Sequence, residues 1–138
     1  MIAETESELA ELSARLHNAR IELPTELEEP DQGPLRLRGA AQLHDLPLVR
    51  ERWPFSRPLE ADMTLSIDHV RTVSLTDDAQ IGVLLVDTLT YDVRSHELRI
   101  EGIVPTDLVL TVADLRIRLE LEGEPRPSTH IRVLRWRR

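Results

Sequence analysis

The chain contains no cysteine and no lysine, and only five of its 138 residues are glycine. Without cysteine it has no disulfide bond, no thiolate nucleophile and no zinc–cysteine site. The glycines form no phosphate-binding loop, because only Gly33 and Gly39 lie near each other, and no Rossmann or nucleophile-elbow motif is present. We therefore expect a protein that needs no cofactor and is not an enzyme.

Aromatic residues are also scarce, since the chain has only Trp53, Phe55, Tyr91 and Trp136. The core must therefore consist mainly of leucine, valine and isoleucine. All seventeen basic residues are arginine, which is typical of a GC-rich coding sequence. Guanidinium groups are weakly hydrated and pair with carboxylates in a planar fork, so an arginine-only surface suits protein contacts.

Long apolar runs are absent as well. No segment approaches the roughly 18 apolar residues of a membrane-spanning helix. The first residues carry Glu4, Glu6, Glu8 and Glu11 in place of the basic region of a secretory signal. Together with the lack of cysteine, these features predict a soluble, cytoplasmic protein.

Residues 1–23 are predicted to form an amphipathic helix. Thr5 and Glu8 have the spacing of a capping box, and Pro24 marks the expected end. The apolar positions recur at intervals of three and four, at Leu9, Leu12, Leu16, Ala19 and Leu23. This stripe covers about two heptads, fewer than a coiled coil requires. It serves either as a contact for a partner or as a cover for the domain's own sheet.

Residues 24–34 are acidic and rich in proline, and we interpret them as a linker. Residues 35–138 alternate apolar and polar residues over about seven segments with short turns, which predicts antiparallel strands. The expected fold class is α+β, mainly β: an antiparallel β-sandwich or barrel preceded by one N-terminal amphipathic helix.

Two irregularities are expected within these strands. The apolar phase slips by one residue near Asp114, which a β-bulge explains. Asp87 lies in phase with Leu85 and Leu89, so it either points inward, with Arg99 or Arg116 as partner, or is carried to the rim by a bulge.

The five histidines are scattered and match no metal-binding motif, so no metal site is predicted. Charge is strongly segregated instead. Residues 1–31 have a net charge of −7 and residues 126–138 a net charge of +5. We interpret this as contact between the acidic segment 22–31 and the basic C-terminal end, within one chain or between neighbours. The overall charge of −8 makes nucleic acid an unfavourable partner.

The segment "RERWPFSRP" at 50–58 holds two of the four aromatic residues between arginines and prolines. Its rings either close one end of the β domain or form an exposed anchor, because large aromatic groups dominate both cores and interfaces. The candidate partner-binding residues are Leu9, Leu12, Leu16, Arg52, Trp53, Phe55, Arg57, Arg135 and Trp136.

These features favour a non-enzymatic protein-interaction or assembly module. It would self-associate or dock on a protein partner through its N-terminal helix, charged termini or aromatic loop. The alternative is a carrier for a small apolar ligand held inside the β domain.

Overall fold

The structure is a computed structural model that describes residues 1–23, 34–44, 49–50, 55–77, 82–103, 106–127 and 132–133, with 49–50, 55–57 and 132–133 as backbone only. Its elements are β1 (Ile2–Ala3), α1 (Glu6–Leu16), β2 (Arg20–Glu22), β3 (Leu35–Gln42), β4 (Val49–Arg50), β5 (Phe55–Arg57), β6 (Leu59–Ile67), β7 (Val70–Asp77), β8 (Val83–Asp92), β9 (Glu97–Gly102), β10 (Thr106–Val112), β11 (Ile117–Pro127) and β12 (Arg132–Val133).

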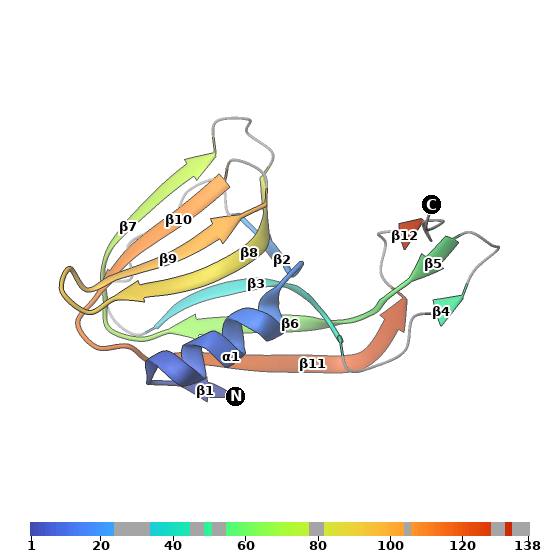
Figure 1. Ribbon diagram of the computed structural model, residues 1–138, viewed down its shortest axis with the longest axis horizontal. Coiled ribbons are helices and arrows are strands. Elements are labelled where there is room, and N and C mark those ends of the chain that lie inside the picture. The colour runs from blue at the N-terminus through green and yellow to red at the C-terminus, as the bar shows by residue number, and fades with distance from the viewer. Residues whose placement is uncertain are drawn as a thin grey trace, which may run out of the picture.

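Nine of the strands form one antiparallel sheet in the order β1-β11-β6-β3-β2-β8-β9-β10-β7, and a small second sheet has the order β12-β5-β4. The large sheet is open but folds over itself, so that β8, β9, β10 and β7 face β3, β6 and β11 across the core (Figure 1). The predicted class, mainly β with one N-terminal helix, is confirmed. The strand number exceeds seven because very short strands such as β1 and β2 leave no alternating pattern in the sequence.

Two features join the layers. On one side, β2 pairs with β3 of the first layer and with β8 of the second. On the other side, β6 continues into β7 and β10 into β11 through bends. The bends are hydrogen-bonded to each other, from Asp68 N to Arg116 O and from Ala113 N to His69 O, both at 3.0 Å. The two long bent strands therefore stay paired as they pass from one layer to the other.

The predicted phase slip near Asp114 is real, and it coincides with the bend. Leu108, Leu110 and Val112 point into the core from β10, whereas Ile117 and Leu119 do so from β11. The register shifts between Thr111 and Val112, and residues 113–116 then leave the strand. The chain turns a corner between the two layers here. This corner, and not a simple bulge, changes which residues of the sequence face the core.

The helix begins as predicted but ends earlier. The Glu8 amide donates to Thr5 Oγ1 at 3.2 Å, and a Glu8 carboxylate oxygen accepts from the Glu4 amide at 3.3 Å. The helix ends at Leu16 because Asn18 is left-handed, with φ of 66°, and donates its amide to Val86 O at 2.8 Å. Hydrogen bonds to β8 thus replace the helical ones well before Pro24.

Residues 1–23 are consequently not a separate helical unit, because β1 and β2 on either side of α1 are strands of the main sheet. Leu9, Leu12 and Leu16 turn inward, with exposed fractions of 4%, 0% and 0%, and α1 contacts β8, β1 and β3. The Leu89 amide also donates to Ser13 Oγ at 2.9 Å, which fixes the helix to β8.

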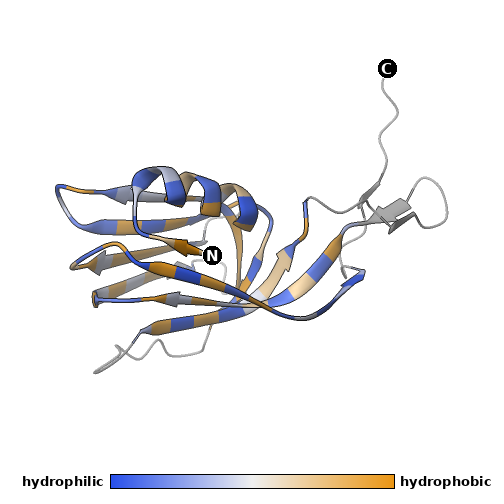
Figure 2. Ribbon diagram, turned by 90° about the horizontal axis from the view of Figure 1, so that it is seen from below, coloured by the Kyte–Doolittle hydropathy of each residue, from blue (hydrophilic) through white to orange (hydrophobic). Residues whose placement is uncertain are grey.

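The core is aliphatic, as the composition requires. Among the described residues, its buried hydrophobic side chains are those of alanine, leucine, isoleucine, valine and Met63. Hydrophobic and hydrophilic residues alternate along the strands, so one face of each layer is apolar and the other polar (Figure 2). In the part of the chain that the structure describes, no helix is long and apolar enough to cross a membrane.

We expect Gly39→Ala to destabilise the fold by about 3 kcal/mol, because overpacking against a fixed backbone cannot relax by a side-chain rotation. A Cβ at this position would lie 1.8 Å from the carbonyl oxygen of Arg20 on β2. Urea unfolding monitored by circular dichroism measures the change.

The matched control is Gly123→Ala. Gly123 has φ of 74° and no atom within 4 Å of an added Cβ, so only the left-handed backbone opposes the substitution, at about 1 kcal/mol. Equal costs for the two variants would contradict the close approach of β2 and β3.

Candidate interaction surface

The leucine stripe of α1 does not form a partner surface. Leu9, Leu12 and Leu16 belong to the hydrophobic core, where they pack beneath the helix against the two layers. The stripe is therefore the cover for the domain's own sheet, and its proposed role as a partner contact is wrong. Its heptad-like spacing reflects a helix with one buried face.

Of the other sequence-predicted site residues, the structure describes Phe55 and Arg57. Arg52, Trp53, Arg135 and Trp136 fall outside the described residues, as do residues 24–31 of the acidic segment 22–31. Phe55 and Arg57 lie on β5, whose backbone pairs with β4 on one side and β12 on the other. Val133 is the register partner of Phe55. This pairing brings Phe55 and Arg57 of β5 together with Arg132 of β12, which is distant in sequence.

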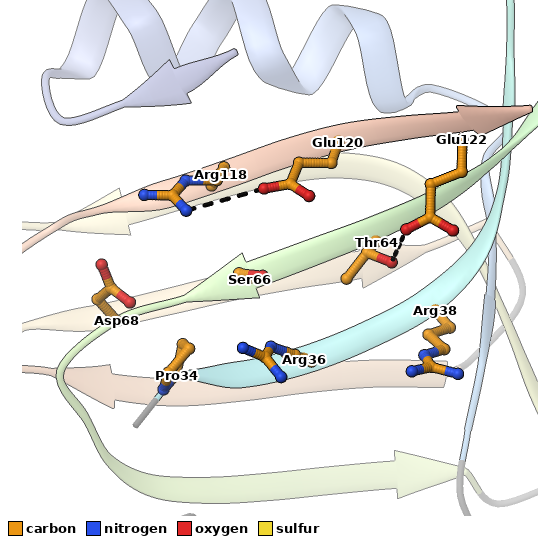
Figure 3. Close-up of a pocket in the computed structure, with 9 residues that line it drawn as sticks. All are labelled: Pro34, Arg36, Arg38, Thr64, Ser66, Asp68, Arg118, Glu120 and Glu122. Atoms are coloured by element: carbon orange, nitrogen blue, oxygen red, sulfur yellow. Dashed lines mark hydrogen bonds and ion pairs between the residues drawn. The ribbon is translucent and has the colours of Figure 1, made fainter. Parts of the chain in front are cut away.

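A second surface, which we call the outer face, consists of the outward side chains of β3, β6 and β11. Register places Arg36, Ser66 and Arg118 in one row across the three strands. The next outward row is Arg38, Thr64 and Glu120, and Glu122 follows along β11. These residues line an open hollow of about 240 Å³ (Figure 3).

Figure 3 shows what each strand contributes to the outer face: two arginines project from β3, hydroxyls from β6, and Arg118 with two carboxylates from β11. Thr64 Oγ1 donates to Glu122 Oε1 at 3.2 Å, and Arg118 lies 3.8 Å from Glu120. Among the described residues, Arg36 and Arg38 have no hydrogen-bond or ion-pair partner. The guanidinium groups of Arg36 and Arg38 are therefore free to meet an external group.

One end of the outer face is held by a buried ion pair. The Glu60 side chain is 2% exposed, and Arg20 Nη2 lies 2.7 Å from each of its carboxylate oxygens. Arg126 from β11 lies 3.7 Å from Glu60 and 2.6 Å from Asp62. Its hydrogen bond to Asp62 raises the pKa of Arg126. The cluster ties β2, β6 and β11 together where the strands leave the two-layer body.

An apolar groove lies between α1 and the sheet, with a volume of about 380 Å³. It is lined by Ala14, Ala41, Leu43, Leu119 and Leu121, with Glu11, Arg15, Gln42 and His44 also at the groove. Leu121 is 48% exposed, which is high for a leucine on a strand. The groove opens to solvent and lies outside the filled core.

Asp87 does not point inward. The register of β8 against β9 shifts between Val86 and Thr88, and this irregularity carries Asp87 to the surface, 3.6 Å from His17. The proposed partners are wrong, since Arg99 pairs with Glu97 and Arg116 with Asp68. Within the described ranges, no group of three or more His, Asp or Glu side chains is arranged to hold a metal ion.

Comparison with models of known protein families, with curated proteins and with solved structures gives no match.

Sequence reasoning missed the Glu60 cluster and the joint surface of β3, β6 and β11. Alternation identified Arg36, Arg38, Glu120 and Glu122 as outward residues, but nothing in the sequence shows which strands are neighbours. For Glu60 a signal existed, because it continues the outward series of β6 on a strand that begins directly after Pro58.

We expect Glu60→Gln to lower the free energy of unfolding by about 3 kcal/mol, because it breaks the two short hydrogen bonds between Arg20 and the buried carboxylate. Chemical denaturation of the full chain measures the loss. Asp62→Asn is the matched control on the same strand, since its side chain is 61% exposed and its ion pair with Arg126 lies in solvent. A loss at Asp62 equal to that at Glu60 would contradict the structural role of the buried pair.

Proposed function

We propose that the chain is a non-enzymatic assembly module that binds further copies of itself through its small basic sheet. The observation that carries this proposal is the pairing of β5 with both β4 and β12. It brings together the backbone segments 49–50, 55–57 and 132–133, which include Arg50, Phe55, Arg57 and Arg132, at one end of β6 (Figure 1).

Charge separation supports this proposal. Residues 49–57 carry three arginines and one glutamate, and residues 126–138 carry five arginines and no acid, which gives a net charge of +7 for the two segments. Because the net charge of the whole chain is −8, the remaining residues have a net charge of −15. A basic element on one copy is attracted to the acidic body of another, and such complementarity speeds and orients association.

The exposure of β11 supports it further. Residues 121–127 are all exposed, although they form a strand, because β11 extends beyond the two-layer body at this end (Figure 1). Strands of two and three residues, such as β12, β5 and β4, form a sheet that is marginally stable by itself in water. A second copy that packs against this element would stabilise it.

Nucleic acid is a less favourable partner. Phosphate groups would be attracted to the small sheet, but the strongly acidic remainder of the chain would repel the rest of a polyanion. A protein partner that carries both acidic and basic regions would not be repelled in this way.

A second candidate function is a carrier for a small apolar ligand. The apolar groove beside α1 favours it, because its volume of about 380 Å³ lies within the usual range of small-molecule sites. This groove is not an internal pocket, since the described interior is filled by aliphatic side chains. Native mass spectrometry of the gently purified protein tests this function: a retained mass of a few hundred daltons would support a carrier.

We expect the full chain to sediment as an oligomer at low salt and to dissociate toward 15.8 kDa at about 0.5 M NaCl, where charges are screened beyond a few ångströms. The triple variant Arg135→Gln, Arg137→Gln, Arg138→Gln should shift the low-salt distribution toward monomer. Analytical ultracentrifugation measures both effects.

The matched control is Arg71→Gln, Arg94→Gln, Arg99→Gln, which removes the same charge from exposed positions on the body. Because this control makes the body more acidic, it should retain or strengthen association. A monomer at every salt concentration, or equal loss in both triple variants, would refute the proposed function.

A further inference from the structure

The two edges of the main sheet differ in character. One edge is β11 where it extends beyond the two-residue strand β1, and there it carries three glutamates, two prolines and Gly123, whose φ is 74°. Charge, proline and bulge-forming glycine are the features that keep an edge strand from pairing with another chain. The other edge is β7, which has none of these features between Arg71 and Asp77. It is therefore the edge that can accept a further strand.

The core-facing side of β7 is only partly covered. β7 pairs with β10 on one side, and among the described residues no strand lies on its other side, at the outer margin of the layer (Figure 1). Val73 and Leu75 face the core but remain half-buried, whereas their register partners Leu110 and Leu108 on β10 are 0% exposed. A strand added beside β7 would extend the cover over both side chains.

We propose that β7 pairs with β7 of a second copy of the chain. The two strands are antiparallel, and the two-fold axis is perpendicular to the sheet and passes between the two Ser74 residues. The main sheets of the two copies then form one continuous sheet, with the core-facing side of each on the same side. The contact is isologous, and it is distinct from that of the small sheet and does not depend on it.

The residue order of β7 is what points to a second copy as the occupant. With Ser74 opposite Ser74, Thr72 of each copy lies opposite Thr76 of the other, on the solvent-facing side. Val73 lies opposite Leu75 on the core-facing side. Each of these pairs forms twice, and both threonine pairs and aliphatic pairs are favourable cross-strand neighbours.

The ends of β7 carry opposite charges. Arg71 is exposed at one end, where β7 shifts register against β10, and it has no ion-pair partner among the described residues. At the other end Asp77 accepts hydrogen bonds from the Gly82 amide at 3.0 Å and the Thr106 hydroxyl at 3.4 Å. An axis at Ser74 brings residues 71 and 77 to one level, so the basic end of each strand meets the acidic end of the other.

Neighbouring registers do not produce these pairs. An axis at Leu75 would place Val73 opposite Asp77, and an axis at Val73 would place Leu75 beside Arg71. Each shift exchanges an aliphatic pair for an aliphatic side chain beside a charge. An axis between two residues would join the core-facing side of one strand to the solvent-facing side of the other. The sequence of β7 therefore selects Ser74 as the centre of the contact.

The contact is small, since its regular part is the five residues from Thr72 to Thr76. Such a pairing buries little surface, so the dimer is weak and forms at high protein concentration. Sedimentation of a dilute sample accordingly reports the small sheet, and the β7 pair needs a method that accumulates a transient contact.

Disulfide trapping in the full chain provides this method, because the chain has no cysteine of its own. Ser74→Cys should form a disulfide-linked dimer under mild oxidation at high protein concentration, measured by gel electrophoresis without reductant. Residues directly opposite each other in an antiparallel pair have Cα atoms about 4.5–5.5 Å apart, within the reach of a disulfide.

Thr72→Cys and Thr76→Cys are the matched controls, exposed on the same strand and face. Each lies about 14 Å from its own counterpart across the axis, so alone it should give at least about tenfold less dimer than Ser74→Cys. An equimolar mixture of the two should recover the dimer, because residue 72 then faces residue 76. Adding Ser74→Lys to both chains of the mixture should abolish the product, since two like charges then meet at the axis. Thermal unfolding checks that each variant is folded.

Four results would overturn the proposal: no dimer from Ser74→Cys, equal dimer from the three single-cysteine variants, no recovery in the mixture, or a mixture product that survives Ser74→Lys. Loss of the Ser74→Cys dimer in the background of the Arg135, Arg137, Arg138 triple variant would also overturn it, because the cross-link would then be a consequence of the small sheet. A dimer that is trapped in this background, after the salt-sensitive oligomer is lost, would support the β7 contact and the proposed function separately.

Discussion

The three-residue strand β2 is the constraint on which the rest of the fold depends, because it hydrogen-bonds to β3 of one layer and to β8 of the other. For this strand to form, the helix must end by Leu16, and Asn18 makes the reversal with a left-handed backbone. Gly39 permits the close approach of β3, and Arg20 places its guanidinium on buried Glu60. The end of α1, the contact between the two layers and the Arg20–Glu60 ion pair thus all depend on the position of β2.

On the opposite side of the fold, the two layers are connected in a different way. There the layers are joined by two long strands that bend together and stay paired, with hydrogen bonds between the bends at Asp68 and Ala113. The sheet therefore folds over a core of aliphatic side chains that needs no aromatic residue among those described. Because the interior is filled in this way, the features that distinguish the chain lie on its surface: a charged outer face, an apolar groove and a basic small sheet.

The small basic sheet and the edge of β7 are the two places that we propose for self-association. In the first proposal the small sheet meets a different, acidic region of a neighbouring copy, and a contact of this kind continues into rings or chains. It depends on arginine, whose planar guanidinium pairs well with carboxylates, so the proposed contact responds to ionic strength.

The sequence alone determined the class of the fold, the start of the helix and the outward positions of most charged residues, because capping and alternation are local effects carried by neighbours in the chain. For that reason the sequence correctly predicts the helix cap of Thr5 and Glu8 and the outward positions of Arg36 and Arg38. Tertiary structure alone decided where α1 ends, that its leucines are core, that Asp87 lies at the surface, and that Arg38 and Glu120 share a row. These depend on hydrogen bonds and register between segments far apart in the chain, and local pattern carries no information on which strands become neighbours.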